Sequence, residues 1–151
     1  MNICIESQLL NHSQRTGLMT YTEGLLNSLK EVDSRNMYYL TYYSLRRKAN
    51  LMPGPEAPNF SKVVLRVPDW RVWFQRFWRD YLVLPNFFKM NKIDIFHRLS
   101  GYNLPPFKEV FKIITVHDLR TLTINDTHLP QNINQYKKAL KQADLCAAVS
   151  E

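Results

Sequence analysis

The chain has little of three things that would each point to a particular class of protein: glycine, cysteine and long hydrophobic runs. Its 151 residues include only 4 glycines and 2 cysteines. No run of about 18 apolar residues occurs, so no segment is expected to cross a membrane as a helix. Cys4 and Cys146 each stand inside an apolar run, which predicts small buried side chains rather than a disulfide or a metal site.

Acidic residues are also scarce relative to basic ones. Asp and Glu number 13 against 20 Lys and Arg, and the net charge is +7. This excess favours an anionic partner: nucleic acid, a membrane surface or a phosphorylated small molecule. No nucleic-acid-binding motif accompanies the charge, so we predict no nucleic-acid partner. Because the N-terminus lacks the pattern of a signal peptide, we expect a cytoplasmic protein.

Patterns typical of strands and helices alternate along the chain. Strands are predicted at residues 3–5, 37–43, 63–67, 94–97, 110–116 and 145–149. Helices are predicted over residues 18–32, from Trp70 until Pro85 ends or kinks the helix, and from about Pro130 to Ala143. The proline-rich segment 46–61 is predicted to be a loop. This order predicts one α/β domain with a doubly wound, mainly parallel six-stranded sheet and helices on both faces.

The predicted helix that begins at Trp70 has an aromatic stripe with arginines beside it. The stripe consists of Trp70, Trp73, Phe74, Phe77, Trp78 and Tyr81. Spacing this regular favours packing of the aromatic face on the sheet. The alternative is a peripheral membrane or protein-interaction module, in which residues 70–82 lie in a lipid interface or contact a partner.

In doubly wound sheets, ligands bind beyond the carboxyl ends of the strands, where the strand order reverses. Arg15, Thr16 and Gly17 follow the first predicted strand and come directly before a helix. The amides of the first helical turn, a glycine that allows close approach and a cation can together hold a phosphate. The alternative is an ordinary helix start with Thr16 as the capping residue.

Two further segments place histidines at strand ends. His117 and Asp118 end the apolar strand 110–116, where a histidine can donate a hydrogen bond to a ligand hydroxyl. Alternatively, His117 caps the sheet and Asp118 caps the next turn. His97 has a similar position on its own strand, but Arg98 beside it makes an ordinary surface pair equally open.

Four motifs together resemble the N-terminal domain of family 4 glycosyltransferases, which are retaining enzymes of the GT-B fold. They occur in the expected order over essentially the whole chain. The motifs are Arg15-Thr16-Gly17-Leu18-Met19-Thr20-Tyr21-Thr22, Leu84-Pro85 with Ile93-Asp94-Ile95-Phe96-His97, Thr115-Val116-His117-Asp118-Leu119, and Ala143-Asp144 through Ala148-Val149-Ser150-Glu151.

The resemblance implies two facing Rossmann-like domains. Residues 1–151 would form the N-terminal, acceptor-side domain, and the C-terminal donor-binding domain would be absent from this chain. The implied reaction transfers a sugar from a nucleotide sugar to a glycan or a lipid-linked acceptor with retention, as in polysaccharide biosynthesis, often at the cytoplasmic face of the membrane. It uses no other cofactor and no metal, and the isolated domain is expected to be inactive.

The resemblance also assigns roles to particular residues. Thr16 and Gly17 would lie near the donor diphosphate, and His117 would be the catalytic-site residue that positions and electrostatically stabilises the transferred sugar. The acceptor would be bound by Arg15, Tyr21, His97, Asp118 and Ser150. Met19 stands where the family usually has a second glycine.

A nicotinamide-dependent oxidoreductase is the alternative that shares this fold class. Such an enzyme needs Gly-x-Gly-x-x-Gly at the first strand–helix turn, and only Gly17 is present there. The glycine count therefore argues against that alternative.

Overall fold

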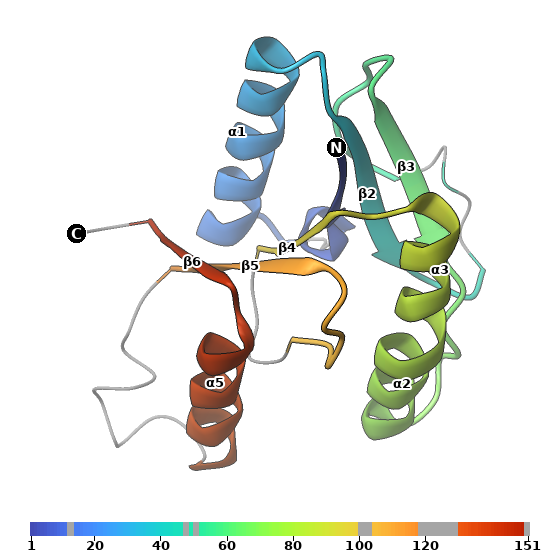
Figure 1. The fold of residues 1–151 in the computed structure, drawn as a ribbon, viewed down its shortest axis with the longest axis vertical. Coiled ribbons are helices and arrows are strands. Elements are labelled where there is room, and N and C mark those ends of the chain that lie inside the picture. Colours follow the sequence, from blue (N-terminus) through green and yellow to red (C-terminus); the bar gives the residue numbers. More distant parts are fainter. Residues whose placement is uncertain (12–13, 47–48, 50–51, 100–103, 118–129, 150–151) are drawn as a thin grey trace.

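A computed structural model describes residues 1–11, 14–46, 49, 52–99, 104–117 and 130–149. Its strands are β1 (Asn2–Glu6), β2 (Met37–Tyr43), β3 (Phe60–Leu65), β4 (Ile95–Arg98), β5 (Phe111–Val116) and β6 (Leu145–Ala148). Its helical segments are η1 (Gln8–Asn11), α1 (Gly17–Val32), α2 (Val72–Trp78), η3 (Arg79–Val83), α3 (Leu84–Asn91) and α5 (Pro130–Gln142). Figure 1 shows these elements as a sheet with helices on both sides.

The sheet confirms the predicted fold class. Its strand order is β3-β2-β1-β4-β5-β6, and all five neighbouring pairs are parallel. The chain winds outward from β1 in one direction, returns, and winds outward from β4 in the other. The order therefore reverses between β1 and β4, as in Rossmann-like doubly wound folds.

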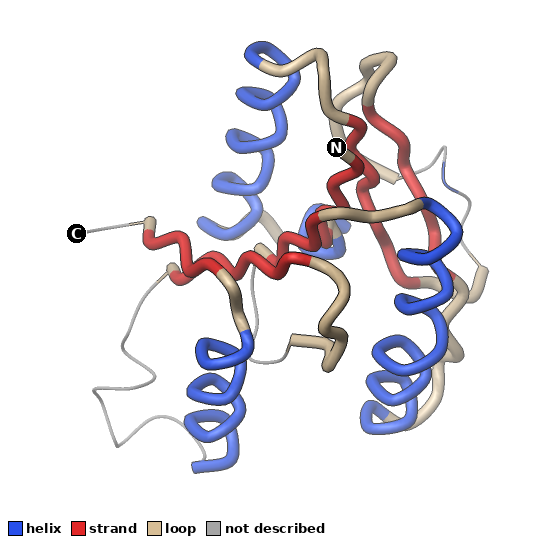
Figure 2. Tube along the Cα trace, viewed as in Figure 1, coloured by secondary structure: helices blue, strands red, loops and turns tan. Residues whose placement is uncertain are grey.

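Hydrophobic side chains cover both faces of this sheet. Along β1, Cys4 belongs to a cluster on one face and Ile5 to a cluster on the other, because successive strand residues point in opposite directions. Leu26 of α1 lies in the second cluster, whereas Phe88 of α3 and Ala139 of α5 lie in the first. Figure 2 shows this arrangement, with α1 on one side of the sheet and α3 and α5 on the other.

Element boundaries follow the sequence pattern except where polar residues enter a strand. The third strand was expected at residues 63–67 but spans Phe60–Leu65. Ser61 and Lys62 pair with β2 in register, although their polar side chains hide the apolar signal of a strand. The prediction that Cys146 is buried is wrong: it is exposed on β6, whereas Cys4 is fully buried. A strand at the outer edge of a sheet has no neighbour on one side, which leaves Cys146 uncovered.

The aromatic stripe does not pack on the sheet, so the prediction that its aromatic face covers the sheet is wrong. Trp70, Trp73, Phe77 and Tyr81 are 66%, 65%, 49% and 56% exposed, and α2 has no buried residue. A wider, π-helical turn follows α2, and Pro85 then lies in the first turn of α3, where its missing amide hydrogen is tolerated. The helical path therefore continues to Asn91, and α3 rather than α2 packs on the sheet.

No helix in the described ranges is both long and apolar enough to cross a membrane.

Alanine substitutions at two glycines are expected to change the free energy of unfolding in opposite directions. Gly54 has φ +126°, and a Cβ there would lie 3.0 Å from Leu40 Cδ1 and 3.2 Å from the Tyr42 hydroxyl. We expect Gly54→Ala to lower the free energy of unfolding by about 1–3 kcal/mol, because backbone strain and crowding add. Urea denaturation measures this change.

Gly24→Ala is the matched control, because a Cβ at this exposed position of α1 meets no atom within 4 Å. It should raise the free energy of unfolding by about 0.5–1 kcal/mol through helix propensity. Equal effects of the two substitutions would contradict the backbone conformation described for Gly54.

Candidate functional site

The carboxyl ends of the parallel strands and the segments that follow them form one edge of the sheet, called here the carboxyl rim. The start of α1 and the end of β5 meet at this rim. Tyr21, one turn into α1, makes an edge-to-face contact with the His117 ring, with 4.9 Å between ring centroids and an interplanar angle of 88°. Residues almost a hundred positions apart are thus brought together, and Gly17 begins the same helix.

His117 is held by the segment that follows β4. Its Nε2 lies 2.7 Å from the carbonyl oxygen of Leu99, a fully buried residue. Because a carbonyl oxygen only accepts, Nε2 must carry a proton and donate it. In the neutral ring Nδ1 is then an acceptor, and no described residue forms a hydrogen bond with it. The ring is therefore oriented by a backbone carbonyl through Nε2.

The start of α1 has an ordinary N-cap residue and unfilled space beside its first residue, Gly17. Thr16 is the N-cap, as the alternative interpretation predicts: its hydroxyl oxygen accepts from the Met19 amide at 3.3 Å. The backbone amides of Gly17 and Leu18 lie in the first turn of the helix, where no carbonyl of the helix can accept a hydrogen bond from them. A Cβ on Gly17 would meet no atom within 4 Å, so packing within the described chain does not require glycine there.

The neighbouring side chains of α1 do not fill this space. Arg15 pairs with Glu23 at 3.1 Å on the surface, where such pairs contribute little to stability. Met19 packs against the hydrophobic cluster that contains Leu26. Among the described residues, no atom therefore fills the space beside Gly17.

His97 has a different environment from His117. Its Nε2 lies 2.9 Å from the Thr115 hydroxyl, which joins β4 to β5. Burial lowers the pKa of His97 from 6.5 to about 4, so the ring is neutral at pH 7. The structure shows it as a cross-strand contact, and its role in acceptor binding stays a prediction.

Sequence reasoning missed a buried charge cluster at the point where the strand order reverses. Arg98, at the end of β4, is only 4% exposed; its Nη2 donates to Glu6 of β1 at 2.9 Å, and its Nε also donates to that carboxylate. The interpretation of Arg98 as part of a surface pair is therefore wrong. Its partner lies 92 positions earlier in the sequence, and only strand order brings the two side chains together.

The same cluster reaches the helix that follows β3. Arg79 pairs with Asp80 at 2.6 Å and lies 4.0 Å from the Glu6 carboxylate. Burial alone would raise the pKa of Glu6, but the charge and hydrogen bonds of Arg98, with the charge of Arg79, outweigh it and lower that pKa. Glu6 is therefore ionised and paired at neutral pH.

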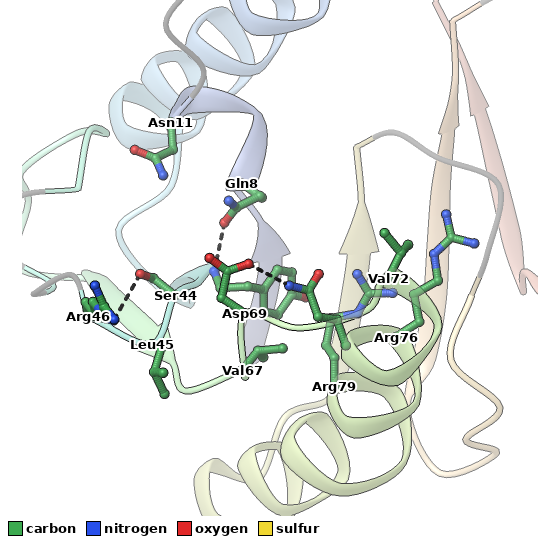
Figure 3. Close-up of a pocket in the computed structure, with 12 residues that line it drawn as sticks. Gln8, Asn11, Ser44, Leu45, Arg46, Val67, Asp69, Val72, Arg76 and Arg79 are labelled. Atoms are coloured by element: carbon green, nitrogen blue, oxygen red, sulfur yellow. Dashed lines mark hydrogen bonds between the residues drawn. The ribbon is translucent and has the colours of Figure 1, made fainter.

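A pocket of about 680 Å³ opens on the rim beside this cluster (Figure 3). Its walls come from η1, the segment after β2, and the segment from Val67 through α2 to Arg79. Gln8, Arg46, Arg76 and Arg79 line it, and the sequence patterns singled out none of them as site residues. Only the position of Gln8 and Arg46 just after predicted strands could have indicated them.

Two predicted acceptor residues, Asp118 and Ser150, lie outside the described residues. Within the described ranges, no group of three or more His, Cys, Asp or Glu side chains is arranged to hold a metal ion.

The structure thus defines a Rossmann-like α/β domain whose carboxyl rim carries an oriented histidine, an open helix start and a pocket with arginines in its wall. No protein-family model matches the chain, and no curated protein or solved structure shows significant similarity to it.

The neutral state of the partly buried His97 predicts a dependence of stability on pH. The unfolded chain binds a proton at the ordinary pKa of 6.5, whereas the folded chain binds it only near 4, so acid favours unfolding. We expect the His97 contribution to the free energy of unfolding to fall by about 2 kcal/mol between pH 7 and pH 5. Urea denaturation at both pH values measures it.

His97→Gln supplies the comparison, because it cannot titrate in this range. Its loss of stability between pH 7 and pH 5 should be smaller than that of the wild type by the same amount. An NMR titration showing that the His97 ring gains a proton near pH 6.5 in the folded protein would disprove the assignment.

Proposed function

We propose that this chain is the N-terminal, acceptor-side domain of a retaining glycosyltransferase of the GT-B fold. The complete protein would transfer a sugar from a nucleotide sugar to a glycan or lipid-linked acceptor, together with a C-terminal donor-binding domain. The observation that supports this most is the contact of Tyr21 with His117 on the carboxyl rim. It joins the two segments that the glycosyltransferase resemblance singles out.

The chemistry of these two segments is compatible with sugar transfer. The free amides and open space at Gly17 suit a diphosphate, because a helix start attracts anions and a glycine lets them come close. His117, held through Nε2, has Nδ1 available for a sugar hydroxyl or for the charge that develops in the transition state. In this proposal His117 positions and stabilises the transferred sugar and is not a nucleophile.

The connection between β1 and α1 weighs against a nicotinamide-dependent oxidoreductase. β1 ends at Glu6 and α1 begins at Gly17, with η1 in between. Dinucleotide-binding folds use a tight, glycine-rich turn here to place the pyrophosphate on the helix start. A connection of this length with a single glycine lacks that turn.

Substitution of His117 tests the proposal in the complete gene product. We expect His117→Ala to lower sugar transfer by about a hundredfold or more, the usual cost of removing one preorganised polar group. The assay measures release of nucleoside diphosphate from a panel of nucleotide sugars in the presence of a membrane extract. Circular dichroism should show an unchanged fold, because His117 is only partly buried.

Gly17→Ala adds a second arm to that experiment. Its Cβ meets nothing in the described chain, so folding should be unaffected while transfer falls, since the added methyl group occupies the proposed diphosphate approach. Transfer at the wild-type rate in both variants would remove the site assignment.

Membrane association is a second candidate function, and the exposure of α2 favours it. The side chains of Trp70, Trp73, Phe77 and Tyr81 face solvent, and Arg71 and Arg76 are exposed on the same segment. Exposed aromatic residues next to arginines are typical of helices that lie in the interface of an anionic bilayer. We propose that this surface, the α2 face, docks the protein on the cytoplasmic side of the membrane, where a lipid-linked acceptor would be found.

Vesicle co-sedimentation tests this candidate. The wild-type chain should bind vesicles of phosphatidylcholine with phosphatidylglycerol more tightly than vesicles of phosphatidylcholine alone, and high salt should weaken the preference. The double variant Trp73→Ser and Phe77→Ser should bind at least tenfold more weakly. Burying each large apolar side chain in the bilayer contributes about 1.5–3 kcal/mol to the free energy of binding.

Phe111→Ser provides a matched control. Phe111 is 47% exposed, close to the 49% of Phe77, but it lies at the start of β5. This variant should bind vesicles as the wild type does. Equal losses in the control and the α2 variant, or no binding of the wild type to anionic vesicles, would contradict docking through α2.

A further inference from the structure

The pocket on the rim lies on one side of the reversal point, and His117 lies on the other. Its walls follow β1, β2 and β3, whereas His117 follows β5. Figure 3 shows Arg46 and Arg76 at opposite ends of the pocket, with Gln8 and Asn11 between them. A volume of about 680 Å³ falls within the usual range of small-molecule sites, roughly 300–1,000 Å³.

The walls of this pocket are held by contacts that do not involve its outer arginines. Gln8 accepts a hydrogen bond from the Tyr43 amide at 2.8 Å, which ties η1 to the end of β2. The Arg79 guanidinium lies over the Tyr43 ring, 5.2 Å from its centroid, and pairs with Asp80. Asp69 accepts from Gln75 at 3.1 Å. The shape of the pocket is therefore built into the fold.

The charge of the pocket wall is positive. Three arginines line it, and Asp69 is the carboxylate among the lining residues. The charge of Arg79 is compensated by Asp80, but no carboxylate in the described ranges lies within 4.0 Å of the Arg46 or Arg76 guanidinium. Both side chains are exposed. Within the described ranges, their charge is therefore not compensated by an ion pair.

We propose that this pocket binds a phosphoryl group of the acceptor. A guanidinium group presents two parallel N–H donors that match the oxygens of a phosphate, and it stays charged at every physiological pH. The identification of the ligand as the acceptor rests on the proposed function, whereas binding of a phosphoryl group does not. An acceptor held here would meet a sugar held at His117 across the reversal point between β1 and β4.

Two sources could supply the phosphoryl group: a soluble phosphorylated molecule and a lipid-linked phosphate. The pocket shares α2 with the exposed aromatic face, since Arg76 lines the pocket while Trp73 and Phe77 face solvent. Because α2 carries both features, a phosphate at a bilayer surface and a soluble one are both candidates, and the experiment needs an arm for each source.

The first arm titrates the 151-residue chain with inorganic pyrophosphate at low ionic strength by calorimetry. The wild type should bind, and the double variant Arg46→Gln and Arg76→Gln should bind on the order of tenfold more weakly or worse, because charge-assisted hydrogen bonds are lost. Succinate should bind at least tenfold more weakly than pyrophosphate. Equal binding of succinate would overturn the phosphoryl assignment.

A matched control removes the same charge outside the pocket. Arg71 and Arg35 are exposed and do not line it, and Arg71 makes no side-chain capping bond to α2. Arg71→Gln with Arg35→Gln should keep the wild-type affinity for pyrophosphate within about twofold, apart from long-range screening. Equal weakening in both double variants would show a general charge effect and overturn the site.

The second arm compares vesicles that contain phosphatidate with vesicles of equal charge that contain phosphatidylglycerol. A preference for phosphatidate that disappears in the Arg46 and Arg76 variant identifies a lipid-borne phosphate as the ligand. Pyrophosphate binding without that preference identifies a soluble one. No binding of pyrophosphate and no preference among vesicles would overturn the proposal.

Neither arm uses a nucleotide sugar, so the two proposals fail separately. Pyrophosphate binding that depends on Arg46 and Arg76, in a protein that transfers no sugar, would leave the pocket assignment intact and remove the glycosyltransferase. Sugar transfer that depends on His117, in a protein whose pocket variant binds pyrophosphate like the wild type, would leave the glycosyltransferase proposal intact and remove the pocket assignment.

Discussion

The buried ion pair of Glu6 and Arg98 is the contact on which the arrangement of the carboxyl rim depends. It joins the carboxyl ends of β1 and β4, the two strands between which the strand order reverses. Removing one partner of a buried pair leaves the other charge uncompensated, which typically costs about 3–5 kcal/mol. Arg79 extends the cluster to the helix after β3, so these charges join β1 and β4 to the wall of the pocket.

This cluster separates two chemically different parts of the rim. On the β5 side, a histidine oriented by a backbone carbonyl contacts Tyr21, one turn into α1. On the β2 side, a cationic pocket is built on Tyr43 and Arg79. A transferase needs two neighbouring subsites, one for the group that is transferred and one for the molecule that receives it. The proposed sugar transfer uses both parts, which follow strands on either side of the strand reversal.

The helical segment after β3 combines two roles that usually belong to separate helices. α3 packs Leu84, Phe87 and Phe88 into the core, while α2 leaves its aromatic residues in solvent. The π-helical turn between them contains the buried Asp80, which pairs with Arg79. The exposed face is therefore anchored to the rim through Arg79 and Asp80. Because α2 also forms part of the pocket wall, a membrane that contacts the α2 face would lie next to that wall.

Local patterns in the sequence determined most of the elements. Apolar periodicity located β2 and α1 closely, and the alternation of strands and helices predicted a parallel, doubly wound sheet, because these features depend on neighbouring residues. Gly17 and His117 were predicted as site residues because each lies at a strand or helix boundary, and their roles stay predictions. Tertiary structure alone decided the burial of Arg98, the exposure of α2 and the gathering of Arg46 and Arg76 around one pocket. Periodicity shows that a helix has an apolar face or that a charge follows a strand, but what covers that face or pairs with that charge comes from distant segments.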